Sequence, residues 1–285
     1  MRASQILEKE VRVEFFPIHL GLQSPGPIIF QAGPVTIRWY SVIIITGIIL
    51  GTLLAQRLAK QRDEDPEKIA DLAVWLVVGA IPFARLYYVL FEWERYAQGP
   101  WWKVFAIWEG GIAIHGAILG GMIAAYLFAK KTKSNFWKLA DICAPALALG
   151  QAIGRWGNFF NSEAFGVPTD LPWKLYIPPE WRPTAFIANN YFHPTFLYES
   201  LWNLMVMSIL LWLFKKFPNW GQGTIAATYA VLYGIGRFWI EGLRTDSLYL
   251  GSLRMAQVVS LLFVALGLFG WWWFNRQPSK ASEPL

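Results

Sequence analysis

Residues 37–56 read IRWYSVIIITGIILGTLLAQ, a run in which Arg38 is the only charged residue. An α-helix of this length is about 30 Å long, which is the thickness of the hydrocarbon core of a bilayer. The stretch therefore predicts a helix that spans a membrane.

The rest of the chain shares this apolar character. Of its 285 residues, 55% are hydrophobic and only 15% are charged, whereas soluble domains carry about 25% charged residues. Runs of about 17 to 25 mostly apolar residues recur along the sequence. Together with the first they predict seven spans, at residues 37–56, 69–91, 111–129, 137–153, 195–214, 223–241 and 254–274. We therefore expect an all-α polytopic membrane protein of about seven transmembrane helices, with its termini on opposite sides.

The longest segment between predicted spans covers residues 154–194. Its glycines and prolines, such as Gly157 and Pro178, have strong turn character. An ordered external cap or a short hairpin is expected there. The chain then divides into an external amino-terminal segment (1–36), a seven-span transmembrane domain (37–274) that includes the external head segment 154–194, and a cytoplasmic tail (275–285).

Basic residues are dense in the short loops on one side of this arrangement. The loops 57–68 and 130–138 hold four each, and Lys215 and Lys216 open a third. Because positively charged short loops stay in the cytoplasm, we place the amino terminus outside and the carboxyl terminus inside. These loops would meet an anionic inner leaflet, so the net charge of +6 requires no nucleic acid as a partner.

A polar face is predicted on the sixth span. Tyr233, Arg237, Glu241 and Arg244 are spaced by four, four and three residues, which places them on one side of a helix. Such a face is costly in lipid, so it must turn toward the bundle interior or a water-filled cavity. One carboxylate against two guanidinium groups leaves a positive charge suited to an external anion. The alternative is an internal salt-bridge network in which Glu241 neutralises both arginines.

Residues 154–166 read GRWGNFFNSEAFG and deliver further polar groups to the edge of an apolar run. Arg155 lies between two glycines, where backbone can come close to a ligand, and Asn158 and Glu163 follow within nine residues. A turn in which asparagine side chains bond their own backbone is the alternative. Three arginines in one cavity would bind phosphate bidentately, and an anionic phospholipid headgroup is the natural ligand at this depth.

His115 stands alone in the apolar third span, beside Gly116 and Gly120, a small-residue pair that permits close helix packing. It is either a satisfied core residue or a group that changes protonation near neutral pH. Cys143 is expected to be a buried small hydrophobe. Because the chain offers no carboxylate cluster for Mg²⁺ and no His/Cys set for Zn²⁺, no metal or other cofactor is expected.

Two more polar groups precede His115. Arg85, Tyr88 and Glu92 form a helical polar face on the second span, which could also be an internal ion pair. Tyr40, in Arg38-Trp39-Tyr40, starts the first span and could anchor it at the interface, with its hydroxyl in the cavity or among the headgroups.

Taken together, these segments resemble one family. Residues 154–166 look like the signature of the bacterial prolipoprotein diacylglyceryl transferases, and four other islands recur in the same order. These are Arg38-Trp39-Tyr40-Ser41, His115-Gly116, His193-Pro194 with Leu197-Tyr198-Glu199, and Tyr233 to Arg244. The likeness reaches from the first span to the sixth. Phe196 departs from it, since some members have glutamine before Leu-Tyr-Glu.

The resemblance implies an enzyme of the bacterial cytoplasmic (inner) membrane. Such an enzyme moves the diacylglyceryl group of phosphatidylglycerol onto the thiol of the lipobox cysteine in a prolipoprotein signal peptide and releases glycerol phosphate. Its implied partners are therefore phosphatidylglycerol, the prolipoprotein and the surrounding membrane lipids.

The resemblance also implies a role for each matching residue. His115 is the candidate base, Arg237 holds the phosphate during transfer, and Glu241 orients Arg237. The implied substrate-binding residues are Arg155 at the headgroup, Asn158, Glu163 and Gly166 around it, Arg244 on the external side, and the hydrogen-bond donors Tyr40 and Tyr233.

Two functions from other classes remain as alternatives. Intramembrane arginines could line the path of an anion or lipid transporter, and the protein could bind lipid without catalysis. A transporter needs polar residues along both halves of its path, whereas Arg155, Arg237 and Arg244 gather toward the outer end. This asymmetry favours an outward-facing catalytic cavity.

Overall fold

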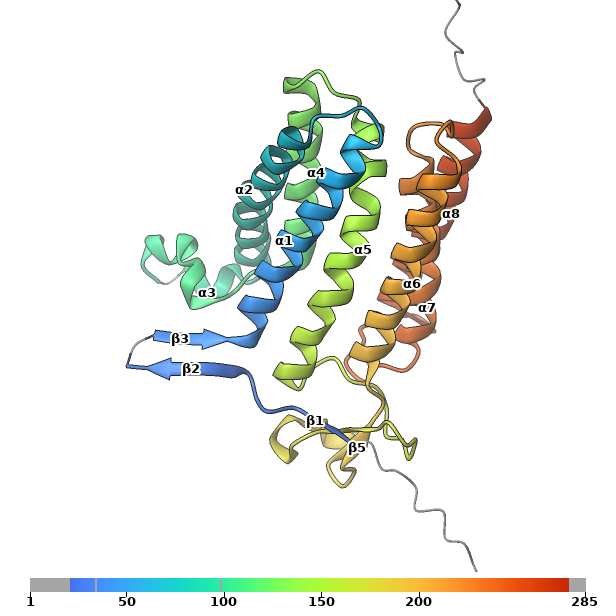
Figure 1. The fold of residues 1–285 in the computed structure, drawn as a ribbon. Helices are drawn as coiled ribbons and strands as arrows, with labels where there is room; N and C mark the ends of the chain where they lie inside the picture. Colours follow the sequence, from blue (N-terminus) through green and yellow to red (C-terminus); the bar gives the residue numbers. More distant parts are fainter. Residues whose placement is uncertain (1–20, 34, 98, 277–285) are drawn as a thin grey trace, which may run out of the picture.

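The computed structural model describes residues 21–33, 35–97 and 99–276, and long helices make up most of this part (Figure 1). Every predicted span overlaps one of them. The long helices are α1 (Trp39–Lys60), α2 (Pro66–Phe91), α4 (Ile114–Lys131), α5 (Phe136–Asn161), α6 (Thr195–Lys216), α7 (Thr224–Glu241) and α8 (Met255–Arg276). Four of these, α1, α2, α6 and α8, are long and apolar enough to cross a membrane by length and composition. The protein is thus a mostly helical membrane protein.

The expectation of an all-α chain was incomplete, because the described residues also contain short strands. They form a three-stranded sheet in the order β1-β4-β5 and two hairpins, β2-β3 and β6-β7. Their bounds are β1 (Leu22–Gln23), β2 (Ile28–Ala32), β3 (Val35–Arg38), β4 (Leu175–Tyr176), β5 (Tyr191–Phe192), β6 (Tyr249–Leu250) and β7 (Leu253–Arg254). Strands of two to five residues are too short to leave a recognisable alternation in the sequence.

Short helices connect the larger elements. One group joins α2 to α4: α3 (Trp93–Ala97) and the 3₁₀ helices η1 (Trp101–Phe105) and η2 (Ile107–Glu109). The other 3₁₀ helices, η3 (Pro179–Trp181) and η4 (Thr184–Phe186), lie between β4 and β5. Residues 1–20 and 277–285 lie outside the described residues, so the amino-terminal segment and the tail predicted from the sequence are covered only in part.

Helix α5 is longer than the sequence suggested. The span was expected to end at residue 153, but the helix continues to Asn161 and ends at Ser162, which has a left-handed backbone with φ of 53°. Gly157 lies inside it and permits close packing, since a Cβ there would come within 2.6 Å of Cδ2 of Tyr40. The residues after Ser162 form an ordered unit around a small core of Phe165, Leu175, Ile177, Phe192 and Phe196.

The helices pack most extensively in the pairs α1 with α5, α2 with α4, α5 with α6, and α7 with α8. The expected close packing at the third span is confirmed: a Cβ on Gly116 would lie 2.3 Å from the carbonyl oxygen of Phe83, and one on Gly120 would lie 2.4 Å from that of Gly79. Only glycine lets the backbones of α2 and α4 approach so closely.

Helix α7 receives its amino-terminal cap from another helix. Gly223 precedes α7 and has no side chain to cap it. Instead, Asp141 of α5 accepts hydrogen bonds from the backbone amides of Gly223 (2.7 Å) and Ala226 (2.8 Å). A carboxylate at this position satisfies otherwise unpaired amides and interacts favourably with the helix dipole. It also ties together the two helices that carry the predicted arginines.

Candidate active site

The predicted arginines converge on a carboxylate in α6. Glu199 is buried, with 4% of its surface exposed. Its Oε2 lies 2.6 Å from Nε of Arg155, and its Oε1 lies 2.9 Å from Nη1 of Arg237 and 3.5 Å from Nη1 of Arg244. One carboxylate thus holds three guanidinium groups from α5, α7 and the turn after α7. Their mutual repulsion would otherwise separate them.

Two further carboxylates complete the group. Nη2 of Arg237 lies 2.6 Å from Oε2 of Glu241, whose Oε1 accepts a hydrogen bond of 2.5 Å from Ser247. Arg244 makes a two-pronged contact with Asp246, with Nε 2.9 Å from Oδ1 and Nη2 2.7 Å from Oδ2. We call this set the arginine–carboxylate cluster; its members are Arg155, Glu199, Arg237, Glu241, Arg244 and Asp246.

The charge balance differs from the sequence-based expectation. The surplus predicted for two arginines against Glu241 is offset, because Glu199 and Asp246 bring the ratio in the cluster to three against three. Burial would raise the pKa of Asp246, but its hydrogen bond and ion pair with Arg244 outweigh that effect and hold the pKa below its usual value. Asp246 therefore stays ionised. The internal salt-bridge network weighed as an alternative is present, and it extends beyond Glu241.

Arg155 nevertheless keeps donors for a ligand. It contacts Glu199 through Nε, and its Nη1 and Nη2 groups make no hydrogen bond to any residue that the structure describes. The side chain is 22% exposed. A planar guanidinium group with two unused Nη groups matches the oxygens of a phosphate or a carboxylate bidentately, and phosphate is the anion of a phospholipid headgroup.

Asn158 and Glu163 contact each other at the end of α5. Both Asn158 and Asn161, in the last turns of α5, donate through Nδ2 to Oε1 of Glu163, at 3.1 and 3.2 Å. The asparagines therefore hold Glu163, and the alternative in which they bond their own backbone does not apply. This contact fixes the start of the segment after α5.

Gly166 joins that segment to the turn that carries Arg244. Its amide donates to the carbonyl of His193 at 2.9 Å, and it forms an isolated bridge with Arg244. A Cβ at Gly166 would lie 2.7 Å from Cβ of His193 and 3.0 Å from the carbonyl oxygen of Leu243. Glycine is required here by this close approach of backbones.

The remaining predicted residues lie outside the cluster, and no hydrogen bond or ion pair among the described residues joins them to it. Tyr40 of α1 is exposed. The ring of Tyr233 stacks on that of Tyr229, with centroids 5.7 Å apart. His115 is exposed in the first turn of α4, and its ring centroid lies 5.8 Å from that of Tyr87.

An apolar pocket of about 320 Å³ is lined by residues that neighbour the cluster in sequence. It lies between α1, α5 and α6, and Trp156 and Ser200, the immediate neighbours of Arg155 and Glu199, line it. The other lining residues are Trp39, Ile43, Ala152, Ile153, Phe160 and Leu204. A charged cluster beside an apolar pocket suits an amphipathic ligand.

Glu199 was missed as a site residue, although the sequence held a signal. It lies within the predicted span 195–214, where a carboxylate is expensive and marks a functional contact. Asp246 could not have been found in this way, because it lies in a connecting segment where a carboxylate is ordinary.

Comparisons with known proteins find a matching family model and similar relatives. The family model described as prolipoprotein diacylglyceryl transferase matches residues 27–273. A protein of Gloeobacter violaceus is 60% identical over 268 residues, covering 94% of this chain and 100% of the relative. One from Acaryochloris marina is 64% identical over 250 residues, covering 88% and 91%. Both relatives are named phosphatidylglycerol–prolipoprotein diacylglyceryl transferase.

Proposed function

The chain belongs to the prolipoprotein diacylglyceryl transferase family, and we propose that the arginine–carboxylate cluster is its active site. The protein is a membrane transferase that moves the diacylglyceryl group of phosphatidylglycerol to a prolipoprotein. The observation that carries the site assignment is the unused fork of Arg155, held by Glu199 beside two further arginines.

The cluster suits the bond that must break. Transfer cleaves the bond between a glycerol carbon of the lipid and a phosphate oxygen, so negative charge grows on the departing glycerol phosphate. Arg155 would grip the phosphate before and during cleavage, and Arg237 and Arg244 would supply a fixed positive field nearby. Preorganised charges of this kind stabilise a transition state without reorganising.

The acceptor is the sulfur of the lipobox cysteine. Its thiol must lose a proton before it attacks the glycerol carbon, because the thiolate is the nucleophile. The new bond is a carbon–sulfur thioether, the electron pair of the broken bond leaves with glycerol phosphate, and the thiol proton passes to a base. His115 is our candidate for that base. Asn158, Glu163 and Gly166 would shape the headgroup site, and Tyr40 and Tyr233 would donate hydrogen bonds to the substrates.

The apolar pocket beside the cluster would hold part of an acyl chain. Trp156 and Ser200 line it and are the sequence neighbours of Arg155 and Glu199. A lipid whose phosphate meets Arg155 could therefore place its tail there. Such burial of apolar surface would add to the affinity of the headgroup contacts.

We also propose the membrane arrangement. All seven long helices would span the cytoplasmic (inner) membrane, with the amino terminus and the segment after α5 outside and the carboxyl terminus inside. The basic loops support this orientation, because α1, α4 and α6 end in Arg57 and Lys60, Lys130 and Lys131, and Lys215 and Lys216. The cluster lies at the opposite ends of the helices.

A transporter is a weaker alternative. Toward the basic ends of the helices the bundle is filled by a buried apolar core, which includes Leu58, Phe128, Leu139, Leu210 and Phe214. A permeating anion would have to cross this core after leaving the cluster. Burying an ion there without partners would cost several kcal/mol.

The function is tested by mixing the purified protein with phosphatidylglycerol and a lipobox peptide. Mass spectrometry should detect the peptide with a diacylglyceryl group on its cysteine, and glycerol phosphate should appear in equal amount. A matched peptide with serine in place of that cysteine should stay unmodified, because a hydroxyl is far less acidic than a thiol. Folded protein that yields no adduct on the cysteine peptide would refute the assignment.

The role of His115 predicts a second result. His115→Gln keeps a polar side chain of similar size but removes the proton acceptor, so the transfer rate should fall by about 10²- to 10⁴-fold. Rates are measured with the lipobox peptide at saturating phosphatidylglycerol. An unchanged rate in His115→Gln would remove His115 from the proton transfer.

A further inference from the structure

A second cationic site lies on the connection between α2 and α4, and it begins with a buried arginine. Arg85 of α2 is 4% exposed. Its guanidinium donates to the backbone carbonyls of Lys103 (2.6 Å), Val104 (2.9 Å), Gly110 (2.5 Å) and Gly111 (2.8 Å). These carbonyls accept from four of its five N–H groups, so the backbone largely solvates Arg85. Among the described residues no ion pair joins Arg85 to Glu92, so the internal ion pair that the sequence left as an alternative is not formed.

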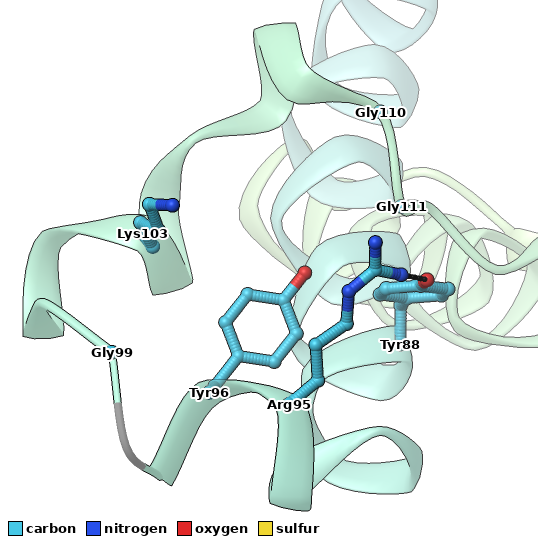
Figure 2. Close-up of a pocket in the computed structure, with 7 residues that line it drawn as sticks. All are labelled: Tyr88, Arg95, Tyr96, Gly99, Lys103, Gly110 and Gly111. Atoms are coloured by element: carbon cyan, nitrogen blue, oxygen red, sulfur yellow. Dashed lines mark hydrogen bonds between the residues drawn. The ribbon is translucent and has the colours of Figure 1, made fainter.

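A pocket of about 210 Å³ lies beside Gly110 and Gly111, two of the residues whose carbonyls bind Arg85 (Figure 2). Arg95 and Lys103 supply its two cationic side chains, and Tyr88 and Tyr96 supply its rings and hydroxyls. Its other lining residues are Gly99, Gly110 and Gly111. In Figure 2 the guanidinium of Arg95 lies between the two tyrosine rings, and its Nη1 donates to the hydroxyl of Tyr88 at 3.3 Å.

The cations at this pocket have no carboxylate partner among the side chains that the structure describes. Arg85, Arg95 and Lys103 make no ion pair with those side chains, and neither Glu92 nor Glu94 reaches them as a salt-bridge partner. The two cations that line this small pocket repel each other and favour an anion. The contrast with the arginine–carboxylate cluster is direct, since each arginine there has a carboxylate partner.

The surroundings place the pocket among lipid headgroups. Its walls belong to the segment that carries the exposed indoles of Trp93, Trp101, Trp102 and Trp108. Tryptophans of this kind prefer the boundary between acyl chains and water, where the phosphates of a bilayer lie. Arg95 and Lys103 therefore face the layer in which phosphate groups are most concentrated.

We propose that this pocket binds a phosphate group, from a lipid headgroup or from free phosphate, at a site separate from the active site. Arg95 contributes a planar fork and Lys103 a point charge, the two common protein ligands of phosphate. Gly99 and Gly110 leave open space at the pocket, since a Cβ at Gly110 would meet nothing within 4 Å and one at Gly99 would meet only the carbonyl oxygen of Tyr96, at 3.7 Å. The hydroxyls of Tyr88 and Tyr96 are further hydrogen-bond donors for phosphate oxygens. The proposal does not depend on the proposed active site.

The test counts bound lipids by native mass spectrometry of the full chain in detergent. In an Arg155→Ala background, which weakens the active-site contact, one phosphatidylglycerol should still bind, and diacylglycerol with the same acyl chains should bind at least tenfold more weakly. The double substitution Arg95→Gln with Lys103→Gln should lower phosphatidylglycerol affinity by about tenfold to a hundredfold. The control is the double substitution Arg57→Gln with Lys60→Gln. Both residues are exposed in the last turn of α1 and neither lines the pocket, so the affinity for phosphatidylglycerol should stay unchanged.

Competition with inorganic phosphate distinguishes the two possible ligands, a lipid headgroup and free phosphate. If millimolar phosphate displaces the lipid from the Arg155→Ala protein, and the double substitution abolishes that competition, the pocket binds free phosphate as well. If phosphate does not displace the lipid, the pocket is specific for lipid headgroups. Equal lipid and phosphate binding with and without Arg95 and Lys103 would overturn the proposal. Loss of peptide transfer in the double variant as deep as in Arg155→Ala would also overturn it, because the pocket would then belong to the reaction.

Discussion

Glu199→Gln should reduce transfer by about 10²-fold or more, although glutamine has nearly the same shape. The substitution removes the charge that holds Arg155, Arg237 and Arg244 within 2.6 to 3.5 Å of one carboxylate. Three guanidinium groups would then repel one another, and the fork of Arg155 would lose its position relative to the phosphate. Glu199 is a positioning residue, so the loss should appear mainly in kcat. It is measured as the initial rate of peptide modification at saturating phosphatidylglycerol.

The same substitution should lower thermal stability, because removing one partner of a buried ion pair costs about 3–5 kcal/mol. Glu64→Gln is a matched control: Glu64 also holds two cations, with Oε1 3.1 Å from Nζ of Lys68 and Oε2 2.9 Å from Nζ of Lys138. It lies at the other end of the bundle and should leave transfer within twofold or so of wild type. A Glu199→Gln protein with wild-type kcat would show that Glu199 does not position the arginines for catalysis.

Arg155→Ala should reduce the rate of transfer by about 10²- to 10³-fold while the protein remains folded in the membrane. Its Nη groups are unused within the described structure and are the donors that we assign to the phosphate. Glu199 would still have Arg237 and Arg244 as partners, so the loss of one arginine should disturb the fold less than the loss of the carboxylate. Peptide modification and the elution profile of the detergent-solubilised protein measure the two properties.

Two other arginine variants sharpen this prediction. Arg155→Lys keeps the charge but not the planar fork, so it should retain only a small part of the activity. Arg182→Ala is the control, because Arg182 lies in the segment between α5 and α6 and donates to the backbone carbonyls of Ile177 and Ile187. It should keep transfer near the wild-type rate. Near-normal turnover in Arg155→Ala would exclude Arg155 from the headgroup site.

Much of the helical framework followed from the sequence, because long apolar runs leave few other possibilities. The spacing of Arg237 and Glu241 correctly placed them on one side of α7, where they pair with each other, whereas Arg244 lies in the turn after the helix. The polar residues from Arg155 onward were recognised as costly at a membrane edge. The continuation of α5 to Asn161 was missed, since glycines that serve helix packing look like turn residues in a sequence.

Contacts between distant segments were the part that the sequence could not provide. Nothing local to Glu199 says that it will meet arginines from two other helices. Similarly, an ion pair of Arg85 with Glu92, two turns away, was one of two alternatives, but carbonyls of residues 103–111 accept the hydrogen bonds of Arg85. A local pattern predicts the side of a helix on which a side chain lies. The residue that it contacts depends on the tertiary fold, which brings distant segments together.

The cap that Asp141 provides for α7 has a consequence at the opposite end of the two helices. Because this carboxylate of α5 accepts hydrogen bonds from the amides of Gly223 and Ala226, the two helices share a fixed point near their amino-terminal ends. Sliding of α7 along α5 would break those bonds. They therefore oppose any shift of Arg237 along the helix axis relative to Arg155.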